Sequence, residues 1–160
     1  MKIMFICTGN ICRSAMAHVM LEDKAKKQNK DIQVYSCGVF AQNGDKSTKE
    51  AIEVMKEYTI NLENHRATNI RNSDIEQMDI ILCATTAHKN NVVNMYPNLE
   101  EKIFTMKEYV EYPKNDLDIK DPWGFDINTY RRCAKEIEDC IEKMMLKQIW
   151  FMQLNQLQKS

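Results

Sequence analysis

Short apolar runs alternate with helix-like segments along the whole chain, and this alternation constrains the fold more than any other feature. Four runs have the length and apolar composition of strands: residues 2–7, 32–40, 78–84 and 102–106. Four segments between and after them have the composition of helices: residues 14–30, 47–58, 86–96 and 128–150. Such an alternation favours parallel strands joined by helical crossovers. The sequence therefore predicts a three-layer α/β fold, a four-stranded parallel sheet with helices on both faces.

Local signals predict where three of the helices begin or end. Ser47 followed by Glu50 has the spacing of a capping box at the start of the second helix. Pro97 predicts the end of the third helix, and Asp126 predicts the N-cap of the last one. No linker or repeat separates the elements, so we expect a single domain over residues 1–150 and a frayed, Gln-rich tail over residues 151–160.

The charges of the 160-residue chain nearly cancel, with 22 basic and 23 acidic side chains. An overall basic excess, the footprint of nucleic-acid binding, is absent, so we expect no nucleic-acid partner. No apolar run is long enough to cross a bilayer, and the opening MKIMFIC is too short for a secretory signal. The six cysteines are irregularly spaced, which favours reduced thiols in a cytoplasmic protein without a membrane partner.

The segment ICTGNICRS concentrates reactive and anion-binding side chains between the first strand and the first helix. Gly9 and Asn10 tolerate the left-handed conformation, which lets a short loop turn its N–H groups inward. These groups and the helix N-terminus behind them form a cradle for phosphate and favour Cys7 as a nucleophilic thiolate. Arg13 can bind two phosphate oxygens at once, and Ser14 can donate a hydrogen bond to the Cys7 sulfur. The segment predicts a catalytic phosphate-binding loop; a packed cysteine in a tight turn is the alternative.

Hydrolysis of a phosphate ester also needs a proton for the leaving oxygen, and the segment NDLDIKDPWGFD offers four aspartates. Asp121 is the best placed of them. Pro122 favours an extended conformation at Asp121, and Trp123 can shield the carboxyl from water and keep it protonated. An Asp-Pro turn with a packed tryptophan is the alternative interpretation.

Metal and nucleotide sites fit this sequence less well. The loop lacks the lysine of a nucleotide P-loop. Cys7 and Cys12 do not have CxxC spacing, and His18, His65 and His88 are scattered along the chain. We therefore expect no metal and no cofactor.

CTGNICRS together with DPWG resembles the low-molecular-weight protein tyrosine phosphatases, in the pattern of bacterial members, over residues 2–146. The resemblance implies a flavodoxin-like fold and metal-independent hydrolysis through a cysteinyl-phosphate intermediate. It implies that Cys7 is the nucleophile and that Arg13 binds the phosphate and the transition state. Asp121 would protonate the leaving oxygen and then activate the hydrolytic water.

The same resemblance implies supporting roles for other residues. Asn10 would hold the left-handed bend of the loop through Ser36 and His65. Cys12 would trap Cys7 as a reversible disulfide under oxidation, with a small packed side chain as the alternative. Besides Cys7 and Arg13, the phosphate-binding loop would comprise Thr8, Gly9, Asn10, Ile11, Cys12 and Ser14.

The residue between Asn10 and Cys12 bears on the substrate. Members that resemble protein arginine phosphatases have threonine there, whereas this chain has Ile11, which suits the face of a phenyl ring. Phe40 and Trp123 are expected as aromatic walls of the site. We therefore predict phosphotyrosine in a phosphorylated protein or peptide as the substrate and phosphoarginine as the alternative, with inorganic phosphate or other oxyanions able to occupy the loop.

Two further functions are less well supported by the sequence. Arsenate reduction needs a relay of cysteines, and Cys83 stands alone after the third predicted strand. A non-enzymatic phosphocarrier or phosphopeptide-binding module would not need the general acid that Asp121 provides.

Overall fold

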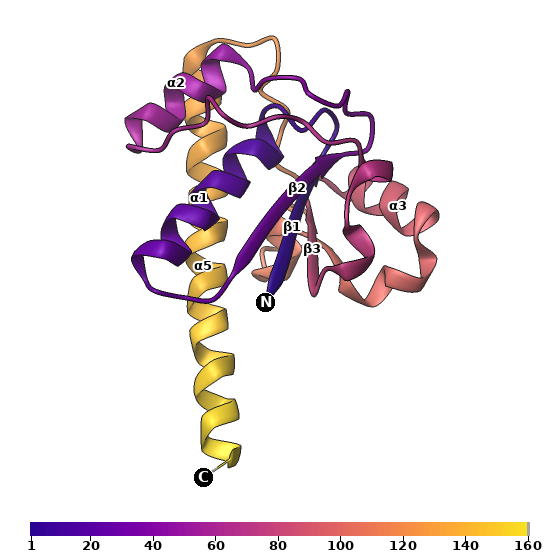
Figure 1. Cartoon of the computed structure of the whole chain (residues 1–160), viewed down its shortest axis with the longest axis vertical. Coiled ribbons are helices and arrows are strands. Elements are labelled where there is room, and N and C mark those ends of the chain that lie inside the picture. Colours follow the sequence, from indigo (N-terminus) through magenta and orange to yellow (C-terminus); the bar gives the residue numbers. More distant parts are fainter. Residues whose placement is uncertain (160) are drawn as a thin grey trace.

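The predicted strands form one parallel sheet in the order β2-β1-β3-β4 (Figure 1). The strands are β1 (Lys2–Cys7), β2 (Gln33–Gly38), β3 (Ile80–Cys83) and β4 (Ile103–Thr105). This is a computed structural model, and it describes residues 1–159 except for the side chains of Ile149, Trp150 and Met152. The prediction of a four-stranded parallel sheet is confirmed; β1 has the predicted bounds, and the other three strands are shorter than the apolar runs.

Helices follow the strands as expected from the alternation. They are α1 (Arg13–Lys27), α2 (Lys49–Glu57), α3 (Thr86–Met95), α4 (Met106–Tyr109) and α5 (Ile127–Lys159). The short helix α4 and three 3-10 turns, η1 (Ile70–Asn72), η2 (Ile75–Gln77) and η3 (Pro97–Lys102), were not predicted. They are too short to give a periodic pattern, so only the folded chain reveals them.

Alternate residues of β1 face opposite layers, as the two-residue period of a strand requires. Ile3 and Phe5 lie in one buried cluster with residues of α1, α2 and α5. Met4 and Ile6 lie in a second cluster with residues of α3 and the 3-10 turns. In Figure 1, α1 and α5 accordingly lie on one side of the sheet and α3 on the other. The three-layer prediction is confirmed.

The predicted helix ends were partly correct. The N-cap of α2 is Thr48, whose hydroxyl accepts a hydrogen bond from Ala51 N–H, so the prediction of Ser47 as cap is wrong by one residue. The Ser47 hydroxyl is buried without a partner among the described residues. Asp126 does cap α5 by accepting from Thr129 N–H at 3.0 Å, and α3 ends at Met95, just before Pro97.

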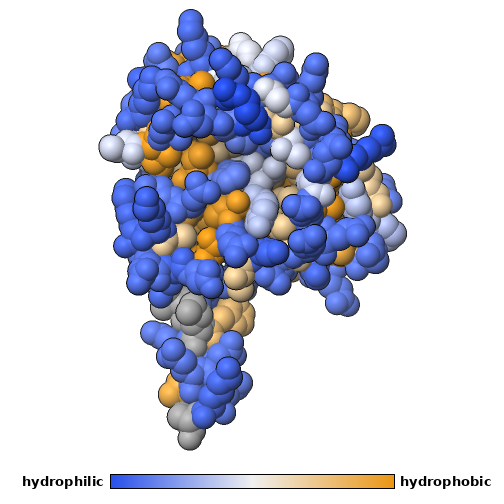
Figure 2. Space-filling model, viewed as in Figure 1, coloured by the Kyte–Doolittle hydropathy of each residue, from blue (hydrophilic) through white to orange (hydrophobic). Residues whose placement is uncertain are grey.

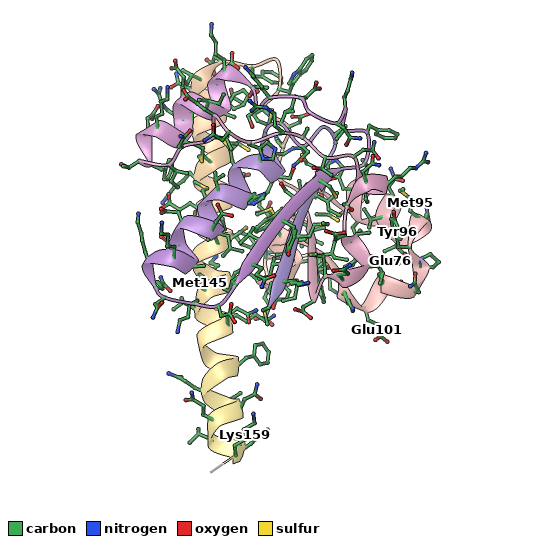
Figure 3. All side chains as sticks on the ribbon, viewed as in Figure 1. Glu76, Met95, Tyr96, Glu101, Met145 and Lys159 are labelled. Carbon is green, nitrogen blue, oxygen red and sulfur yellow. The ribbon has the colours of Figure 1, made fainter. Side chains whose placement is uncertain are left out.

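Helix α5 continues beyond the predicted end at residue 150 and reaches Lys159, so the expected frayed tail is helical. Its first half packs against α1 and α2, and its last turns project beyond the rest of the molecule (Figure 1). Met145 lies where α5 still contacts the body, and Lys159 lies near the far tip (Figure 3). The projecting part is largely hydrophilic with scattered apolar residues (Figure 2). No described helix is long and apolar enough to cross a membrane.

The sheet order decides where a site can form. Strand β1 lies between β2 and β3. The chain runs from β1 outward to β2 and then crosses back past β1 to β3, so the strand order reverses beside β1. Ligands of such sheets bind at this reversal, beyond the carboxyl ends of the strands. The β1–α1 loop, residues 7–13, lies at that position.

Candidate active site

The β1–α1 loop bends through a left-handed residue, as predicted. Asn10 is fully buried and has φ of 56°. Its side chain is fixed at both ends, because Oδ1 accepts from Thr68 N–H at 3.0 Å and Nδ2 donates to Ser14 Oγ at 2.8 Å. Asparagine can hold this conformation at modest cost because its short polar side chain bonds locally.

His65 contacts the loop as predicted, whereas Ser36 does not. His65 Nε2 donates to the backbone oxygen of Asn10 at 2.8 Å. Ser36 lies one step further back, where its hydroxyl bonds His18 Nδ1 at 2.7 Å, and the His18 ring meets the His65 ring edge to face. Among the described residues, the hydrogen bond of Ser36 therefore reaches the loop indirectly, through the rings of His18 and His65. These two histidines look scattered in the sequence but are neighbours in the fold.

The Cys7 sulfur is positioned by the same network. Cys7 is buried at the end of β1, and its Sγ lies 2.9 Å from Ser14 Oγ. Ser14 Oγ already accepts from Asn10 Nδ2, so its own hydrogen is available to donate to a Cys7 thiolate. The N-terminus of α1, which begins at Arg13, adds a partial positive charge behind the loop. This arrangement favours a nucleophilic sulfur.

Arg13 links the β1–α1 loop to the segment of residues 115–121, called here the 115–121 loop. The Arg13 side chain is only 5% exposed, its Nη1 donates to the Ile119 backbone oxygen at 2.9 Å, and its Nη2 lies 3.6 Å from Asp121 Oδ2. A buried guanidinium beside Cys7 is placed to bind phosphate oxygens with the N–H groups along the edge of its plane.

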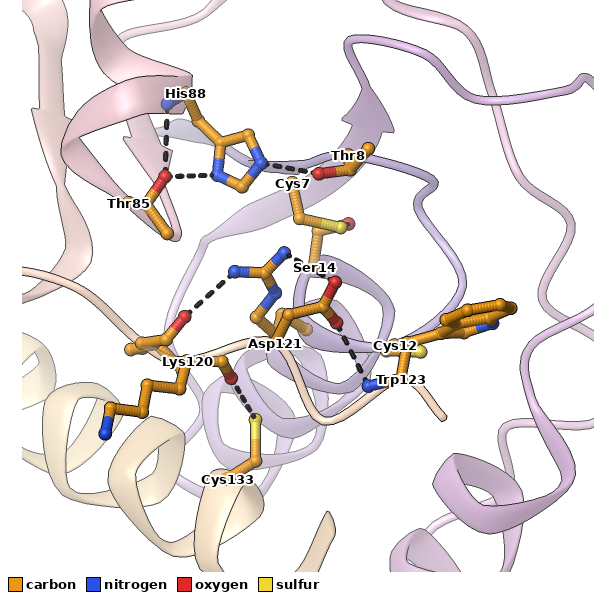
Figure 4. A network of polar contacts seen from close by, with 12 residues as sticks. Cys7, Thr8, Cys12, Ser14, Thr85, His88, Lys120, Asp121, Trp123 and Cys133 are labelled. Atoms are coloured by element: carbon orange, nitrogen blue, oxygen red, sulfur yellow. Dashed lines mark hydrogen bonds and ion pairs between the residues drawn. The ribbon is translucent and has the colours of Figure 1, made fainter. Parts of the chain in front are cut away.

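Asp121 lies at the mouth of the site, but Trp123 does not bury it. Trp123 N–H donates to Asp121 Oδ1 at 3.1 Å (Figure 4). The Asp121 side chain is 53% exposed and Trp123 is 63% exposed. The expectation that Trp123 shields the carboxyl from water is therefore wrong, because Trp123 itself projects into solvent.

These side chains line one pocket of about 340 Å³. Cys7, Arg13 and Asp121 meet there although Asp121 is more than a hundred residues from the other two. Ile11 and Trp123 also line it, as expected for substrate walls. The other lining residues are Thr8, Gly9 and Cys12. Phe40, expected as a wall, is not among them; its side chain is 75% exposed on the turn after β2.

Cys12 lines the pocket but is engaged by its own neighbours. Its Sγ lies 3.3 Å from the Tyr130 hydroxyl and 3.6 Å from Thr48 Oγ1. Burial raises the pKa of the Cys12 thiol. All six cysteines are free and buried, including Cys83 at the end of β3. A disulfide between Cys7 and Cys12 stays a prediction.

His88 is a site residue that the sequence did not reveal. Its Nε2 lies 2.8 Å from Thr8 Oγ1 and its Nδ1 lies 2.8 Å from Thr85 Oγ1 (Figure 4). Burial, aided by the charge of Arg13, lowers the pKa of His88 to about 4. Thr8 and His88 are 80 residues apart, and the only local signal was the Thr85 N-cap three residues before His88.

Gly38 is a second residue that sequence reasoning missed. A Cβ atom there would lie 2.5 Å from the Thr8 backbone oxygen and 2.9 Å from the Asn10 backbone nitrogen. The glycine in YSCG therefore lets the β1–α1 loop pack directly on the end of β2.

Sequence and fold are both similar to those of known phosphatases. The family model described as low molecular weight phosphotyrosine protein phosphatase matches residues 2–159. A protein-arginine-phosphatase of Geobacillus stearothermophilus is 37% identical over 91% of this chain and 95% of that protein. The low molecular weight protein-tyrosine-phosphatase PtpB of Staphylococcus epidermidis is 35% identical over 92% of this chain and 99% of that protein. The crystal structure of a low molecular weight protein tyrosine phosphatase from T. tengcongensis superposes with a TM-score of 0.87 at 39% identity, covering 92% of this chain and 99% of that one.

Proposed function

The chain belongs to the low molecular weight phosphotyrosine protein phosphatase family, and we propose that it hydrolyses phosphotyrosine in proteins or peptides through a phosphorylated Cys7. It is a phosphatase; the substrate and the residue roles are the proposal. The observation that carries it is that a cysteine, an arginine and an aspartate line one pocket: Cys7, Arg13 and Asp121. We also propose a cytoplasmic location, because this chemistry needs a reduced thiol.

In the first step the Cys7 thiolate attacks phosphorus. An S–P bond forms and the bond from phosphorus to the ester oxygen breaks. Protonated Asp121 gives its proton to the leaving phenolate oxygen, so tyrosine leaves neutral. Arg13 and the N–H groups of the β1–α1 loop bind the phosphoryl oxygens on which negative charge gathers.

In the second step water attacks the phosphorus of the cysteinyl phosphate. The Asp121 carboxylate takes a proton from this water as the new O–P bond forms. The S–P bond breaks and its electron pair returns to Cys7 as a thiolate, which Ser14 stabilises by donating its hydroxyl hydrogen. Inorganic phosphate then leaves, and Asp121 is protonated for the next cycle.

The substrate preference rests on the apolar lining of the pocket. Ile11 offers a hydrocarbon surface to an aromatic ring but no hydrogen bond to a guanidinium, and Trp123, which also lines the pocket, can stack on such a ring. Phosphoarginine is the second candidate, because a relative at 37% identity is a protein-arginine-phosphatase.

Turnover of p-nitrophenyl phosphate in the presence of a chelator tests the mechanism. We expect activity in the wild type, none in Cys7→Ser, and unchanged activity in the matched control Cys140→Ala, whose thiol is buried within α5. Asp121→Ala is expected to slow hydrolysis of a phosphotyrosyl peptide by about 10²–10⁴-fold. Activity that survives in Cys7→Ser would rule out the cysteinyl-phosphate route.

Paired phosphopeptides test the substrate. We expect the wild type to have a higher kcat/KM for phosphotyrosine than for phosphoarginine, and we expect Ile11→Thr to shift the ratio toward phosphoarginine. A wild-type preference for phosphoarginine would leave the mechanism in place and replace the substrate.

A further inference from the structure

Thr8 directly follows the proposed nucleophile Cys7. Its hydroxyl is hydrogen-bonded to His88, which lies in α3, the helix after β3. His88 lies in the first turn of α3 and is 8% exposed. Its ring bonds the Thr8 hydroxyl through Nε2 and the Thr85 hydroxyl through Nδ1, each at 2.8 Å (Figure 4). Thr8 also lines the pocket, so the His88 ring is separated from the pocket by the Thr8 side chain alone.

The contact follows from the order of the strands. Strands β1 and β3 are neighbours and parallel, so the loops after them emerge side by side at the same edge of the sheet. Thr8 follows β1, while Thr85 and His88 follow β3. The side chain at position 8 therefore lies close to the first residues of α3.

His88 carries one ring hydrogen at neutral pH, because burial and the charge of Arg13 lower its pKa to about 4. Whether that hydrogen is on Nδ1 or Nε2 decides which hydroxyl, that of Thr8 or that of Thr85, does not donate its hydrogen to the ring. Thr85 Oγ1 already accepts from the backbone N–H of His88 at 3.1 Å.

With the hydrogen on Nε2, Thr85 is fully paired, and the hydroxyl hydrogen left over is that of Thr8, which is exposed and lines the pocket. Thr85 accepts from the His88 backbone and donates its hydroxyl hydrogen to Nδ1, while Nε2–H donates to Thr8 Oγ1. With the hydrogen on Nδ1, Thr85 would accept twice, and its own hydrogen would have no acceptor among the contacts of the described residues. Each tautomer leaves one hydroxyl hydrogen without a protein acceptor. In the Nε2–H tautomer it belongs to exposed Thr8, where water or a ligand can accept it, and in the other it belongs to half-buried Thr85, so the Nε2–H tautomer is favoured.

In that tautomer Thr8 accepts from His88 and keeps its own hydroxyl hydrogen free. We infer that Thr8 donates a hydrogen bond from its side chain to an oxygen of the bound phosphate ester, and that His88 is the positioning residue that turns this hydroxyl into the pocket. The inference rests on the proposed function, since it adds a side-chain donor to the phosphate site described above. The side chain of Thr8 then binds phosphate in addition to the backbone N–H groups of the β1–α1 loop.

Binding of inorganic phosphate, measured by isothermal titration calorimetry, tests this without turnover. Thr8→Val removes the hydroxyl at nearly constant shape, and we expect phosphate affinity to fall by about 3- to 10-fold, the range of one net hydrogen bond. Thr8→Ser keeps the hydroxyl and is the matched control, with affinity within about twofold of the wild type. Equal affinity in Thr8→Val and the wild type would overturn the inference.

His88 is tested through its coupling to Thr8. His88→Ala is expected to weaken phosphate binding as much as Thr8→Val, and the double variant is expected to be no weaker than either single one. His88→Gln, whose side-chain N–H can replace Nε2–H, is expected to restore affinity. Multiplied losses in the double variant, or a failure of His88→Gln to restore binding while Thr8→Val still binds weakly, would remove His88 from this role.

Failure of the proposed function and failure of the Thr8 hydrogen bond give different results. Wild-type protein that binds phosphate but does not turn over p-nitrophenyl phosphate contradicts the proposed function and leaves the Thr8 test intact. If His88→Ala does not fold, as judged by circular dichroism, the pair Thr8→Val and Thr8→Ser still decides whether the hydroxyl binds the ligand.

Discussion

At the scale of single residues, the β1–α1 loop is held by groups from other parts of the chain. Asn10 is fixed by Thr68 and His65, and Arg13 is fixed by the Ile119 carbonyl. Preorganised donors bind a transition state better than donors that must first be ordered, because the cost of ordering has already been met in folding. Changes in this supporting shell should therefore alter catalysis without removing any reacting group.

Gly38→Ala tests that view. The added Cβ would meet the backbone of Thr8 at 2.5 Å and of Asn10 at 2.9 Å, and backbone cannot move aside cheaply. We expect a loss of about 1–3 kcal/mol in the free energy of unfolding and a clear fall in kcat/KM. Urea unfolding and p-nitrophenyl phosphate assays measure the two effects.

Gly44→Ala is the matched control for Gly38→Ala. Gly44 has φ of 90° and open space around it. The substitution should cost about 1–2 kcal/mol through backbone strain alone and leave kcat/KM unchanged. If both variants lose activity equally, the close packing at Gly38 is not what positions the loop.

At the scale of elements, the 115–121 loop is anchored from three sides. Lys107 of α4 bonds Asp116 at 2.7 Å, Asp118 accepts from Thr86 N–H at 2.7 Å, and Ile119 N–H donates to the Ala84 backbone. These contacts connect α4, α3 and the end of β3 to the segment that carries Asp121. The position of the proposed acid therefore depends on α3 and α4.

Lys107→Met should loosen the 115–121 loop. The Lys107 side chain is 4% exposed but Asp116 is 54% exposed, so solvent screens the pair and the expected stability loss is only about 0.5–1 kcal/mol. Proton donation matters more for a basic leaving group than for p-nitrophenolate. We therefore expect a larger fall in kcat with phosphotyrosine than with p-nitrophenyl phosphate.

Lys135→Met is the control for Lys107→Met. Lys135 pairs with Glu138 and Asp139 on the exposed face of α5, with a 62% exposed side chain. Lys135→Met should leave kcat unchanged both with phosphotyrosine and with p-nitrophenyl phosphate. An equal effect of Lys107→Met on both substrates would argue against a role in positioning Asp121.

The projecting end of α5 should be dispensable. Gln148 is still buried and donates to the Tyr109 hydroxyl at 2.9 Å, whereas residues 153–159 are exposed. We expect deletion of residues 151–160 to leave the midpoint of thermal unfolding within a few degrees and kcat/KM within twofold. A loss of folding would show that the domain does not end near residue 150.

At the scale of the whole molecule, buried histidines make stability depend on pH. Burial lowers the pKa of His18 and His65, and lowers that of His88 to about 4. Well above pH 6.5, the ordinary histidine pKa, these groups are neutral in both the folded and the unfolded chain. As pH falls from about 6.5 toward 4, the unfolded chain takes up protons that the folded chain does not, so stability falls.

His88→Gln isolates one part of this pH dependence. Glutamine can keep the hydrogen bond to Thr8 but cannot titrate. We expect the stability of the wild type relative to His88→Gln to decrease between pH 6.5 and 4 and to be constant above pH 7, as measured by urea unfolding at each pH. A difference that does not change with pH would mean that His88 does not stay neutral in the folded protein.

The sequence by itself determined the parts that depend on local chemistry. Short apolar runs predicted the four strands, helical composition and spacing predicted the main helices, and the family resemblance of CTGNICRS and DPWG identified Cys7, Arg13 and Asp121 as residues of one site. Both signals are local, because periodicity reflects which face is buried and a loop of seven residues can assemble its own anion cradle.

Only the tertiary structure decided which distant residues complete the site. The order β2-β1-β3-β4 puts His88 against Thr8 and Gly38 against the loop, and it leaves Phe40 in solvent and Ser36 behind two histidines. Contacts between residues 30 to 110 positions apart depend on strand order and crossover geometry, which leave no periodic trace in the sequence. The nucleophile could be predicted from the sequence, whereas the hydrogen bonds that orient its neighbours required the fold.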